Sequence, residues 1–383
     1  MLYYSILMNN MKNPFVYGSI VTKEHFVGRE KEIKELTAGL LGGQHIILYS
    51  PRKFGKSSLV EETFRRINNS RKAIAFRINL QGVETGEALA SVLIDETIKR
   101  TYSSVEKLSK ELKGLFKKIN VRVFVDKEGK MGIEPVFKET KDALEDALNF
   151  PERVAGKKNK RIIVCFDEFQ EIEKFNGLRI EKLFRAITEA HKNVSYMFTG
   201  SEKHTISLMF ESKDRPFYRF ARFLELKTMP DNCLKNFMIK KFNATNKYIT
   251  DEAVEMVIKF SEGIPFYVQC ICHEAWYLTE KKITKETIKQ ALDEKILSSL
   301  TPGFEMVWNK IRSEMQRRLL LAMAVEDKAG YSISFIEKYK LKSSGHVKKS
   351  LGALEKSGLV YNMRIDDFFF REWIKKYRTY HGY

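Results

Sequence analysis

Apolar residues follow two different periods along the first 230 residues of the chain. Short continuous apolar runs predict buried strands, and apolar residues that recur every three or four positions predict helices. The predicted strands are 44–49, 73–80, 161–167, 194–199 and 223–226, and the predicted helices are 58–67, 87–102, 141–148 and 178–191. Because strands and helices alternate, we expect an α/β fold built on a parallel sheet of five strands.

The middle of the chain departs from this alternation at two places. Residues 121–125 and 131–136 flank a turn that contains Gly129, which predicts a β-hairpin inserted in the core at about 119–137. Residues 231–295 are predicted to be helical throughout, with a break at 263–265. The core is therefore expected to end near residue 230 and to be followed by a helical domain over 231–300.

The end of the chain, from residue 301, predicts three helices followed by a hairpin. The predicted helices are 306–325, 334–340 and 346–356, and the predicted strands are 359–364 and 368–374. A helix-turn-helix followed by a hairpin resembles a winged helix. We therefore expect three domains: a core over 1–230, a helical domain over 231–300 and a winged helix over 301–383.

The composition is that of a soluble protein with sizeable cores, because 43% of the residues are hydrophobic and 30% are charged. No stretch approaches the ~18 uncharged apolar residues of a membrane-spanning helix. The apolar start of the chain is too short for a signal peptide. The four cysteines lack the spacing of a zinc site, which predicts structural thiols and a cytoplasmic protein with no membrane partner.

The formal net charge of +18 favours an anionic partner such as nucleic acid. The lysines, however, are spread along the whole chain and mixed with glutamates. An organism whose proteins are generally basic would produce the same total. The charge alone therefore leaves nucleic-acid binding open.

A phosphate-binding loop is predicted between the first strand and the first helix. Residues 50–57 match the pattern G-x-x-x-x-G-K-[ST], except that Ser50 replaces the first glycine. Gly55 allows a tight turn that points backbone amides at phosphate oxygens, and the following helix adds its positive N-terminal end. Lys56 is expected to reach the β- and γ-phosphates, and Ser57 to bind Mg²⁺. The alternative is a basic turn before an ordinary helix.

The residues expected to contact the nucleotide through this loop form one continuous segment. They are Ser50, Pro51, Arg52, Lys53, Phe54, Gly55, Lys56, Ser57 and Ser58.

Two acidic residues follow the buried strand 161–167 at its carboxyl end, where parallel sheets bind their ligands. Asp167 is expected to bind Mg²⁺ together with Ser57. Glu168 is expected to orient and polarise an attacking water. An apolar run ending in Asp-Glu is weak evidence alone, but it becomes strong a hundred residues after a phosphate loop.

These motifs together resemble the archaeal AAA+-type ATPases of the STAND superfamily, which are relatives of the origin-recognition ATPases. Residues 50–57 resemble the Walker A motif of that family, 164–168 its Walker B motif, and 199–201 its sensor 1 region. Residues 13–15 and 26–30 resemble the N-terminal segment that lies against the adenine, which would place Phe26 and Val27 there. Residues 263–265 resemble the GxP motif of the lid, whose proline, here Pro265, approaches the base.

The resemblance implies a P-loop NTPase core with helices on both faces of the sheet, a helical lid and a C-terminal winged helix. It also implies ATP or ADP with Mg²⁺ as the bound ligands, and the absence of a guanine signature fits ATP. Residues 266–278 contain no lysine or arginine, so the lid lacks a sensor 2 arginine, as in STAND members. This departure from other AAA+ proteins implies slow hydrolysis and a role as a switch.

Three arginines, Arg215, Arg219 and Arg222, resemble the arginine-bearing segment before the last core strand. Each is a candidate for stabilising charge on the transferred phosphoryl group of a neighbouring subunit. Arg222 fits the family spacing best. The alternative for each is a surface arginine paired with local acids.

The third helix of the winged-helix domain carries His346, Lys348 and Lys349 on its polar face. Such a helix can enter the major groove of double-stranded DNA while its lysines contact phosphates. In STAND proteins, however, a winged helix often packs on the nucleotide domain or mediates assembly.

Three functions remain in competition. The first is an ATP-dependent switch with weak ATPase activity. The second is a DNA-binding regulator or initiator that ATP licenses for assembly. The third is a scaffold for a protein partner or homo-oligomer that binds nucleotide without turnover. Salt-dependent binding to duplex DNA separates the second from the others.

Overall fold

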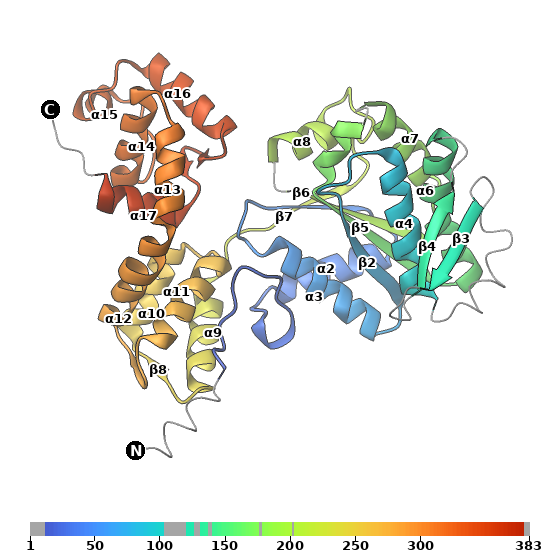
Figure 1. Cartoon of the computed structure of the whole chain (residues 1–383), viewed down its shortest axis with the longest axis horizontal. Helices are drawn as coiled ribbons and strands as arrows, with labels where there is room; N and C mark the ends of the chain where they lie inside the picture. The colour runs from blue at the N-terminus through green and yellow to red at the C-terminus, as the bar shows by residue number, and fades with distance from the viewer. Residues whose placement is uncertain are drawn as a thin grey trace. The chain divides into compact units, whose positions relative to one another are not determined.

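A computed structural model describes residues 12–102, 120–125, 131–136, 140–175, 178–200 and 203–378. The chain forms two compact units (Figure 1). The core unit comprises Tyr17–Met229 with Ile264–Phe266, and the C-terminal unit comprises Met1–Val16, Pro230–Gly263 and Tyr267–Tyr383. None of the described helices is long and apolar enough to cross a lipid bilayer.

The core unit is built on a five-stranded sheet in the order β2-β5-β6-β1-β7, and every neighbouring pair is parallel. The strands are β1 (Ile46–Tyr49), β2 (Ala73–Asn79), β5 (Arg161–Asp167), β6 (Val194–Gly200) and β7 (Arg222–Glu225). The expected parallel α/β sheet is therefore confirmed. Asn79 pairs with Asp167, and Tyr49 pairs with Gly200. This register brings the carboxyl ends of the central strands to one edge of the sheet.

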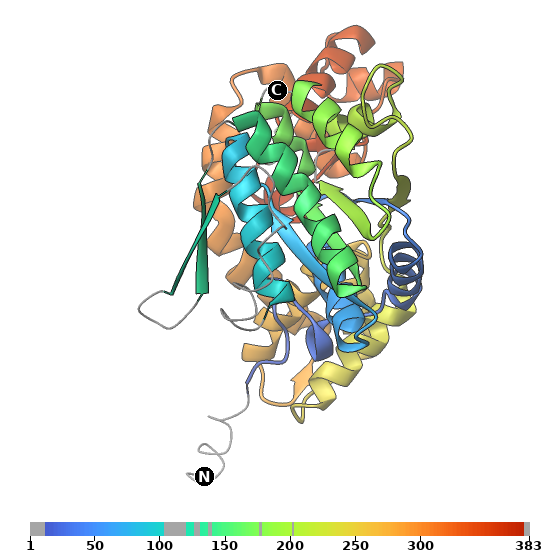
Figure 2. The ribbon, with the colours of Figure 1, turned by 90° about the vertical axis from the view of Figure 1, so that its right-hand side faces the viewer.

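Helices cover both faces of this sheet. They are α2 (Glu30–Leu41), α3 (Lys56–Asn69), α4 (Gly86–Thr101), α6 (Thr140–Lys158), α7 (Leu178–Thr188) and α8 (Lys203–Glu211), with 3-10 turns η1 (Lys23–His25) and η2 (Phe169–Phe175). Ile47 and Leu48 alternate between two hydrophobic clusters, one packed under α4, α6 and α7 and the other under α2 and α3. Figure 2 shows α4 and α6 running side by side.

Two expectations for the core unit can be compared with the structure. Strands β3 (Asn120–Val125) and β4 (Met131–Val136) pair antiparallel, which confirms the inserted hairpin. Its turn at 126–130, and residues 119 and 137, lie outside the described residues. Helix α6 continues to Lys158, beyond the predicted end at residue 148. Pro151 lies inside this helix.

The C-terminal unit begins with helices α9 (Asp231–Asn243), α10 (Asp251–Ser261), α11 (Pro265–Tyr277) and α12 (Lys285–Gln290), followed by the π-helical segment η3 (Ala291–Leu297). The predicted break between helices is present, and Gly263 there has a φ of +75°. The region is not helical throughout, because the two-residue strands β8 (Tyr248–Ile249) and β9 (Lys282–Ile283) pair in parallel.

A winged helix completes the C-terminal unit. It contains α13 (Ser298–Lys310), α14 (Glu314–Glu326), α15 (Ile333–Lys338), α16 (Ser344–Lys356), the short wing β10 (Val360–Tyr361) and β11 (Arg364–Ile365), and α17 (Phe368–Tyr377). Gly358, with a φ of +71°, follows α16 as the expected C′ glycine.

Three element predictions in this domain were wrong. The strand predicted over 359–364 is not one strand, because β10 and β11 pair antiparallel around a turn at 362–363. The single helix predicted over 306–325 is two helices, because Ile311 leaves the helical conformation and Ser313 caps α14 by accepting a hydrogen bond from the backbone N–H of Gln316. The strand predicted over 368–374 is the helix α17. Asp367 caps it by accepting a hydrogen bond from the backbone N–H of Phe369.

Candidate functional site

The loop between β1 and α3 has the backbone geometry of an anion-binding turn. Gly55 is the N-cap of α3 with a φ of +83°, a conformation that glycine adopts without steric cost. No side chain caps the helix, and its first turn contains no acidic residue. Its N-terminal amides and the positive end of its dipole are therefore suited to an anionic ligand.

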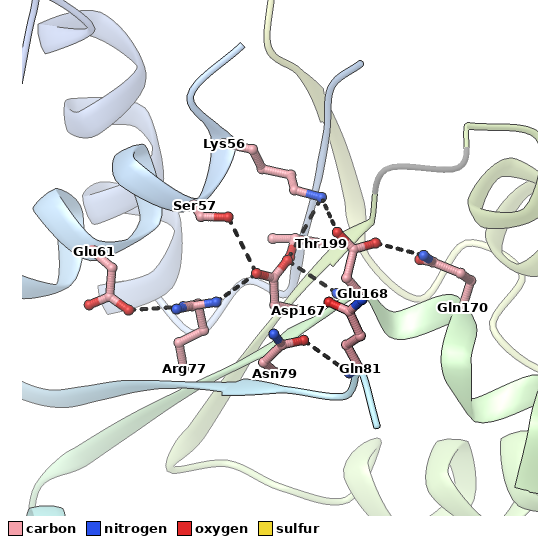
Figure 3. Close-up of polar contacts among 10 residues, drawn as sticks. All are labelled: Lys56, Ser57, Glu61, Arg77, Asn79, Gln81, Asp167, Glu168, Gln170 and Thr199. Atoms are coloured by element: carbon pink, nitrogen blue, oxygen red, sulfur yellow. Dashed lines mark hydrogen bonds and ion pairs between the residues drawn. The ribbon is translucent and has the colours of Figure 1, made fainter. Parts of the chain in front are cut away.

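The carboxyl end of β5 places two carboxylates beside this loop (Figure 3). The Nζ of Lys56 lies 3.7 Å from Asp167 Oδ1 and 3.4 Å from Glu168 Oε1. The hydroxyl of Ser57 donates to Asp167 Oδ2 at 3.4 Å. The structure thus brings together Lys56, Ser57, Asp167 and Glu168 from two segments more than a hundred residues apart.

Three further side chains hold these carboxylates in place. Arg77 of β2 donates to Asp167 Oδ2 at 2.7 Å, and the Thr199 hydroxyl of β6 donates to Asp167 Oδ1. Gln170 donates to Glu168 Oε2 at 2.6 Å. Sequence reasoning named the region of Thr199 by resemblance but missed Arg77 and Gln170. An arginine inside an otherwise apolar strand was the one available signal for Arg77.

The charges around Asp167 keep it ionised. Burial alone would raise the pKa of its carboxyl, but Lys56, the Thr199 hydroxyl and Arg77 together lower this pKa below its ordinary value. Glu168 has a φ of +53°, a left-handed conformation that costs a non-glycine residue roughly 1 kcal/mol or more. Such strain often persists where function requires a particular orientation.

The oxygens of Ser57 and Asp167 fit a magnesium ion. Mg²⁺ prefers hard oxygen ligands and usually takes only one or two from the protein, together with phosphate and water. Among the residues that the structure describes, no group of three or more His, Cys, Asp or Glu side chains could hold a metal ion unaided. Ser57 and Asp167 would supply two oxygens to such a metal, and phosphate and water would supply the rest.

Comparison with known proteins decides the family. A model described as "ATPase domain predominantly from Archaea" matches residues 26–271. The chain belongs to this family of archaeal ATPase domains. A second model, described as "Probable winged helix domain", matches residues 302–376. The chain is therefore an ATP-binding protein with an ATPase domain and a winged helix.

The individual relatives of this ATPase-domain protein are distant in sequence. An uncharacterised ATP-binding protein of Methanocaldococcus jannaschii is 25% identical over 294 residues, which cover 73% of this chain and 75% of the relative. The Walker-type ATPase of Pyrococcus abyssi has a TM-score of 0.63 and 19% identity, covering 96% of this chain and 99% of that one. The ORC1 protein of Aeropyrum pernix, solved in complex with DNA, has a TM-score of 0.50 and 12% identity, covering 93% and 94%. These structural likenesses show the fold.

The N-terminal segment of the ATPase domain lies along α3. The backbone N–H of Val21 donates to Ser58 Oγ, and that of Lys23 donates to Glu62 Oε2, both at 3.1 Å. Phe26 packs, partly buried, against the hydrophobic cluster under α2 and α3. Val27 is likewise partly buried. The contacts of Ser58 thus hold this segment, a role the sequence did not suggest.

The segment 13–15, expected against the adenine, lies in the C-terminal unit. Phe15 is only 1% exposed and packs on Phe237 and Phe242. The side-chain oxygen of Gln269 accepts a hydrogen bond from the backbone N–H of Val16. The ring of Phe15 therefore belongs to the interior of that unit.

The three candidate arginines of the ATPase domain pair locally or lie away from the phosphate loop. Arg222 pairs in register with Ile46 at the start of β1, whereas the loop follows the other end of that strand. Its guanidinium forms an ion pair with Glu35. Arg215 forms ion pairs with Glu173 and the buried Glu181. Arg219 lies over the ring of Tyr218 at 5.1 Å.

The third helix of the winged helix, α16, presents one polar and one apolar face. His346, Lys348 and Lys349 are exposed, whereas Val347 and Leu351 are buried. The hydroxyl of Ser343 caps the helix by accepting from the backbone N–H of His346.

Proposed function

We propose that this protein is an ATP-controlled conformational switch that hydrolyses ATP slowly to ADP and phosphate. The observation that carries the proposal is the meeting of Lys56 and Ser57 with Asp167 and Glu168 at the carboxyl edge of the sheet. A phosphate loop and a carboxylate pair in this relation suit binding and cleavage of a nucleoside triphosphate. Family membership supports ATP as that nucleotide.

Each residue has a distinct role in this proposal. The backbone amides of the loop and the ammonium of Lys56 bind the β- and γ-phosphates. Ser57 and Asp167 would hold Mg²⁺, which supplies positive charge against the phosphate oxygens when bound. Glu168 accepts a proton from water as the water oxygen bonds to the γ-phosphorus and the bond to ADP breaks.

Two features support slow turnover. Glu168 has one oxygen near Lys56 Nζ and the other on Gln170, so both must rearrange before it can take a proton from water. Residues 266–278 also supply no cation to the phosphates, because they contain no lysine or arginine. Both features fit the proposed membership of the STAND superfamily. The resemblance of the sequence to that superfamily is also what implied a switch.

Contacts within the C-terminal unit support a conformational role. The proposed base-contacting Pro265 lies in Ile264–Phe266, which belong to the core unit, whereas Glu262 and Tyr267 on either side belong to the C-terminal unit. Glu262 forms an ion pair with Arg371 of α17. The Tyr267 hydroxyl donates to Asp367 Oδ1 at 3.2 Å and accepts from the backbone N–H of Phe368 at 2.9 Å. A shift at Pro265 on nucleotide binding would therefore be passed to the winged helix.

The proposal includes a cytoplasmic location and a protein partner or second copy of the chain as the recipient of the signal. The four cysteines form no disulfide among the residues that the structure describes, and this fits a reducing compartment.

ATP turnover and nucleotide binding test the proposal directly. Wild type should hydrolyse ATP slowly, Glu168→Gln should lose turnover but bind ATP, and Lys56→Ala should lose binding. Glu171→Gln is the matched control, because the carboxylate of Glu171 forms its ion pair with Lys174 and the change leaves the backbone unaltered. Absence of nucleotide binding by wild type would overturn the proposal.

A DNA-binding regulator or initiator is the second candidate, because α16 exposes His346, Lys348 and Lys349 together. Wild type should then bind duplex DNA with a strong salt dependence, and Lys348→Ala with Lys349→Ala should weaken binding about tenfold and reduce the salt slope. Lys281→Ala with Lys282→Ala, an exposed pair outside the winged helix, is the control. Binding that survives the α16 changes undiminished rejects recognition through this helix.

A further inference from the structure

Arg77 stands out as a charged side chain in the interior of a buried strand. It lies on β2 between Phe76 and Ile78, which are both buried. Its guanidinium bridges two acids, donating through Nε to Glu61 Oε1 at 2.9 Å and through Nη1 to Asp167 Oδ2 at 2.7 Å. Only 17% of the side chain is exposed, so solvent screens these contacts poorly.

The oxygen that Arg77 contacts is the one that faces Ser57. Asp167 Oδ2 accepts from both Arg77 and the Ser57 hydroxyl, whereas Oδ1 accepts from Thr199 and from the backbone N–H of Glu168. The oxygen suited to a metal shared with Ser57 therefore already carries a cationic partner (Figure 3).

A fixed guanidinium beside this oxygen opposes the arrival of a divalent cation. Two cations that share one carboxylate oxygen repel each other strongly in a partly buried site. A bound triphosphate adds several negative charges on the opposite side, which outweigh the single charge of Arg77. The metal is then favoured only when the phosphates are present.

We infer that Arg77 makes divalent-metal binding at Ser57 and Asp167 conditional on nucleotide, by placing a permanent positive charge on the metal-facing oxygen of Asp167. Arg77 is thus a positioning residue, because it acts on the metal site through Asp167. The inference rests on the proposed metal site but does not require ATP hydrolysis.

Direct Mn²⁺ binding to the nucleotide-free protein tests this inference. Free Mn²⁺ is measured by electron paramagnetic resonance for wild type, Arg77→Gln and Arg77→Lys. We expect Arg77→Gln to bind Mn²⁺ about tenfold or more tightly than wild type, because the repelling charge is gone. Arg77→Lys, which keeps the charge, should remain close to wild type.

Arg153→Gln provides a matched control. Arg153 pairs with the buried Asp146 at 2.6 Å and its side chain is 20% exposed, so it is, like Arg77, a largely buried arginine paired with a buried carboxylate. This variant should leave Mn²⁺ affinity unchanged. A merely structural role for Arg77 predicts that Arg77→Gln also leaves the affinity unchanged or weakens it.

The outcomes are decisive even where folding is impaired. Circular dichroism establishes whether each variant is folded. If Arg77→Gln is not folded, Arg77→Met, which retains the apolar stem of the side chain, replaces it. Unchanged or weaker Mn²⁺ binding by a folded, uncharged variant overturns the inference. The inference is also overturned if Arg77→Lys tightens Mn²⁺ binding as much as the uncharged variant does. A wild type that binds no ATP would reject the proposed function, yet the Mn²⁺ comparison would still stand.

Discussion

Ser50 occupies the place where the phosphate-loop pattern has its first glycine. It is 1% exposed, and its hydroxyl has no hydrogen-bond partner among the residues that the structure describes. A buried hydroxyl without a partner is costly, so such a group in a phosphate loop suggests a contact completed by ligand.

We expect Ser50→Ala to weaken ATP binding about tenfold or more, because a hydrogen bond to a charged group contributes roughly 1.5–3 kcal/mol. The nucleotide-free protein should be as stable as wild type or slightly more stable, since the unpaired hydroxyl is removed. Calorimetric titration with ATP and thermal unfolding without it measure the two effects. Unchanged ATP affinity would show that the hydroxyl does not contact the ligand.

His45, the residue before β1, makes the stability of the protein depend on pH. Its Nδ1 accepts a hydrogen bond from the backbone N–H of Tyr196 at 3.1 Å, which requires the neutral ring. Burial, with the nearby positive charges of Arg185, His191 and Arg161, lowers the pKa of His45 to about 4. The unfolded chain binds this proton near its ordinary pKa of 6.5, so the unfolded state is favoured as the pH falls from 6.5 to 4.

The free energy of unfolding should therefore drop by about 2 kcal/mol between pH 7 and pH 5 through this group. Urea unfolding at a series of pH values measures the slope. In His45→Asn the drop between pH 7 and pH 5 should be smaller by about 2 kcal/mol. The exposed His346→Gln should keep the wild-type drop. A wild-type slope in His45→Asn would contradict the assignment.

At the scale of single elements, the end of β6 is closely packed against the site. A Cβ atom on Gly200 would lie 2.5 Å from Gln170 Oε1 and 2.6 Å from Ile206 Cγ1. Real atoms do not approach so closely, so the side chains of both Gln170 and Ile206 must shift. Because Gln170 holds Glu168, the packing of this strand end is linked to the chemistry of the site.

Gly200→Ala should lower the free energy of unfolding by about 1–3 kcal/mol through overpacking and should also reduce ATP turnover. Chemical denaturation and a steady-state ATPase assay measure these effects. Gly156→Ala is the control, because nothing lies within 4 Å of its added Cβ and it sits inside α6. That change should stabilise the protein by roughly 0.5–1 kcal/mol. Equal behaviour of the two variants would contradict the packing argument.

At the scale of the whole molecule, the proposed switch depends on α17. Arg371 is buried and forms ion pairs with Glu262 beside the break between α10 and α11 and with Asp327 after α14. A single guanidinium thus joins the helical domain to two parts of the winged helix. Removing it takes this cation from Glu262, whereas Asp327 keeps its ion pair with Arg364.

We expect Arg371→Gln to retain ATP binding but to lose the nucleotide-dependent change in hydrogen exchange of α17. Tyr267→Phe, which removes the hydroxyl contacts to Asp367 and Phe368, should have the same effect with less loss of stability. Hydrogen–deuterium exchange with and without ATP is the measurement. The control is Arg378→Gln, whose partner Glu305 lies on α13. An unchanged exchange response in both test variants would reject this coupling.

The sequence by itself determined the strands of the sheet, the phosphate loop and the acidic strand end. Each of these is a local pattern, set by the hydrophobicity and backbone preferences of neighbouring residues. Local patterns failed where two signals competed. The apolar period of 306–325 hides a break at Ile311, and the aromatic residues of 368–374 favour a strand until the Asp367 cap starts a helix.

Only the tertiary structure decided which distant side chains support the site. Arg77 and Asp167 are 90 residues apart in sequence and meet because β2 pairs with β5 in one particular register. Phe15 similarly joins Phe237 and Phe242 in the C-terminal unit, although it precedes the core in sequence. Strand register and the partner of an apolar residue depend on how the whole chain packs, and no local pattern carries that information.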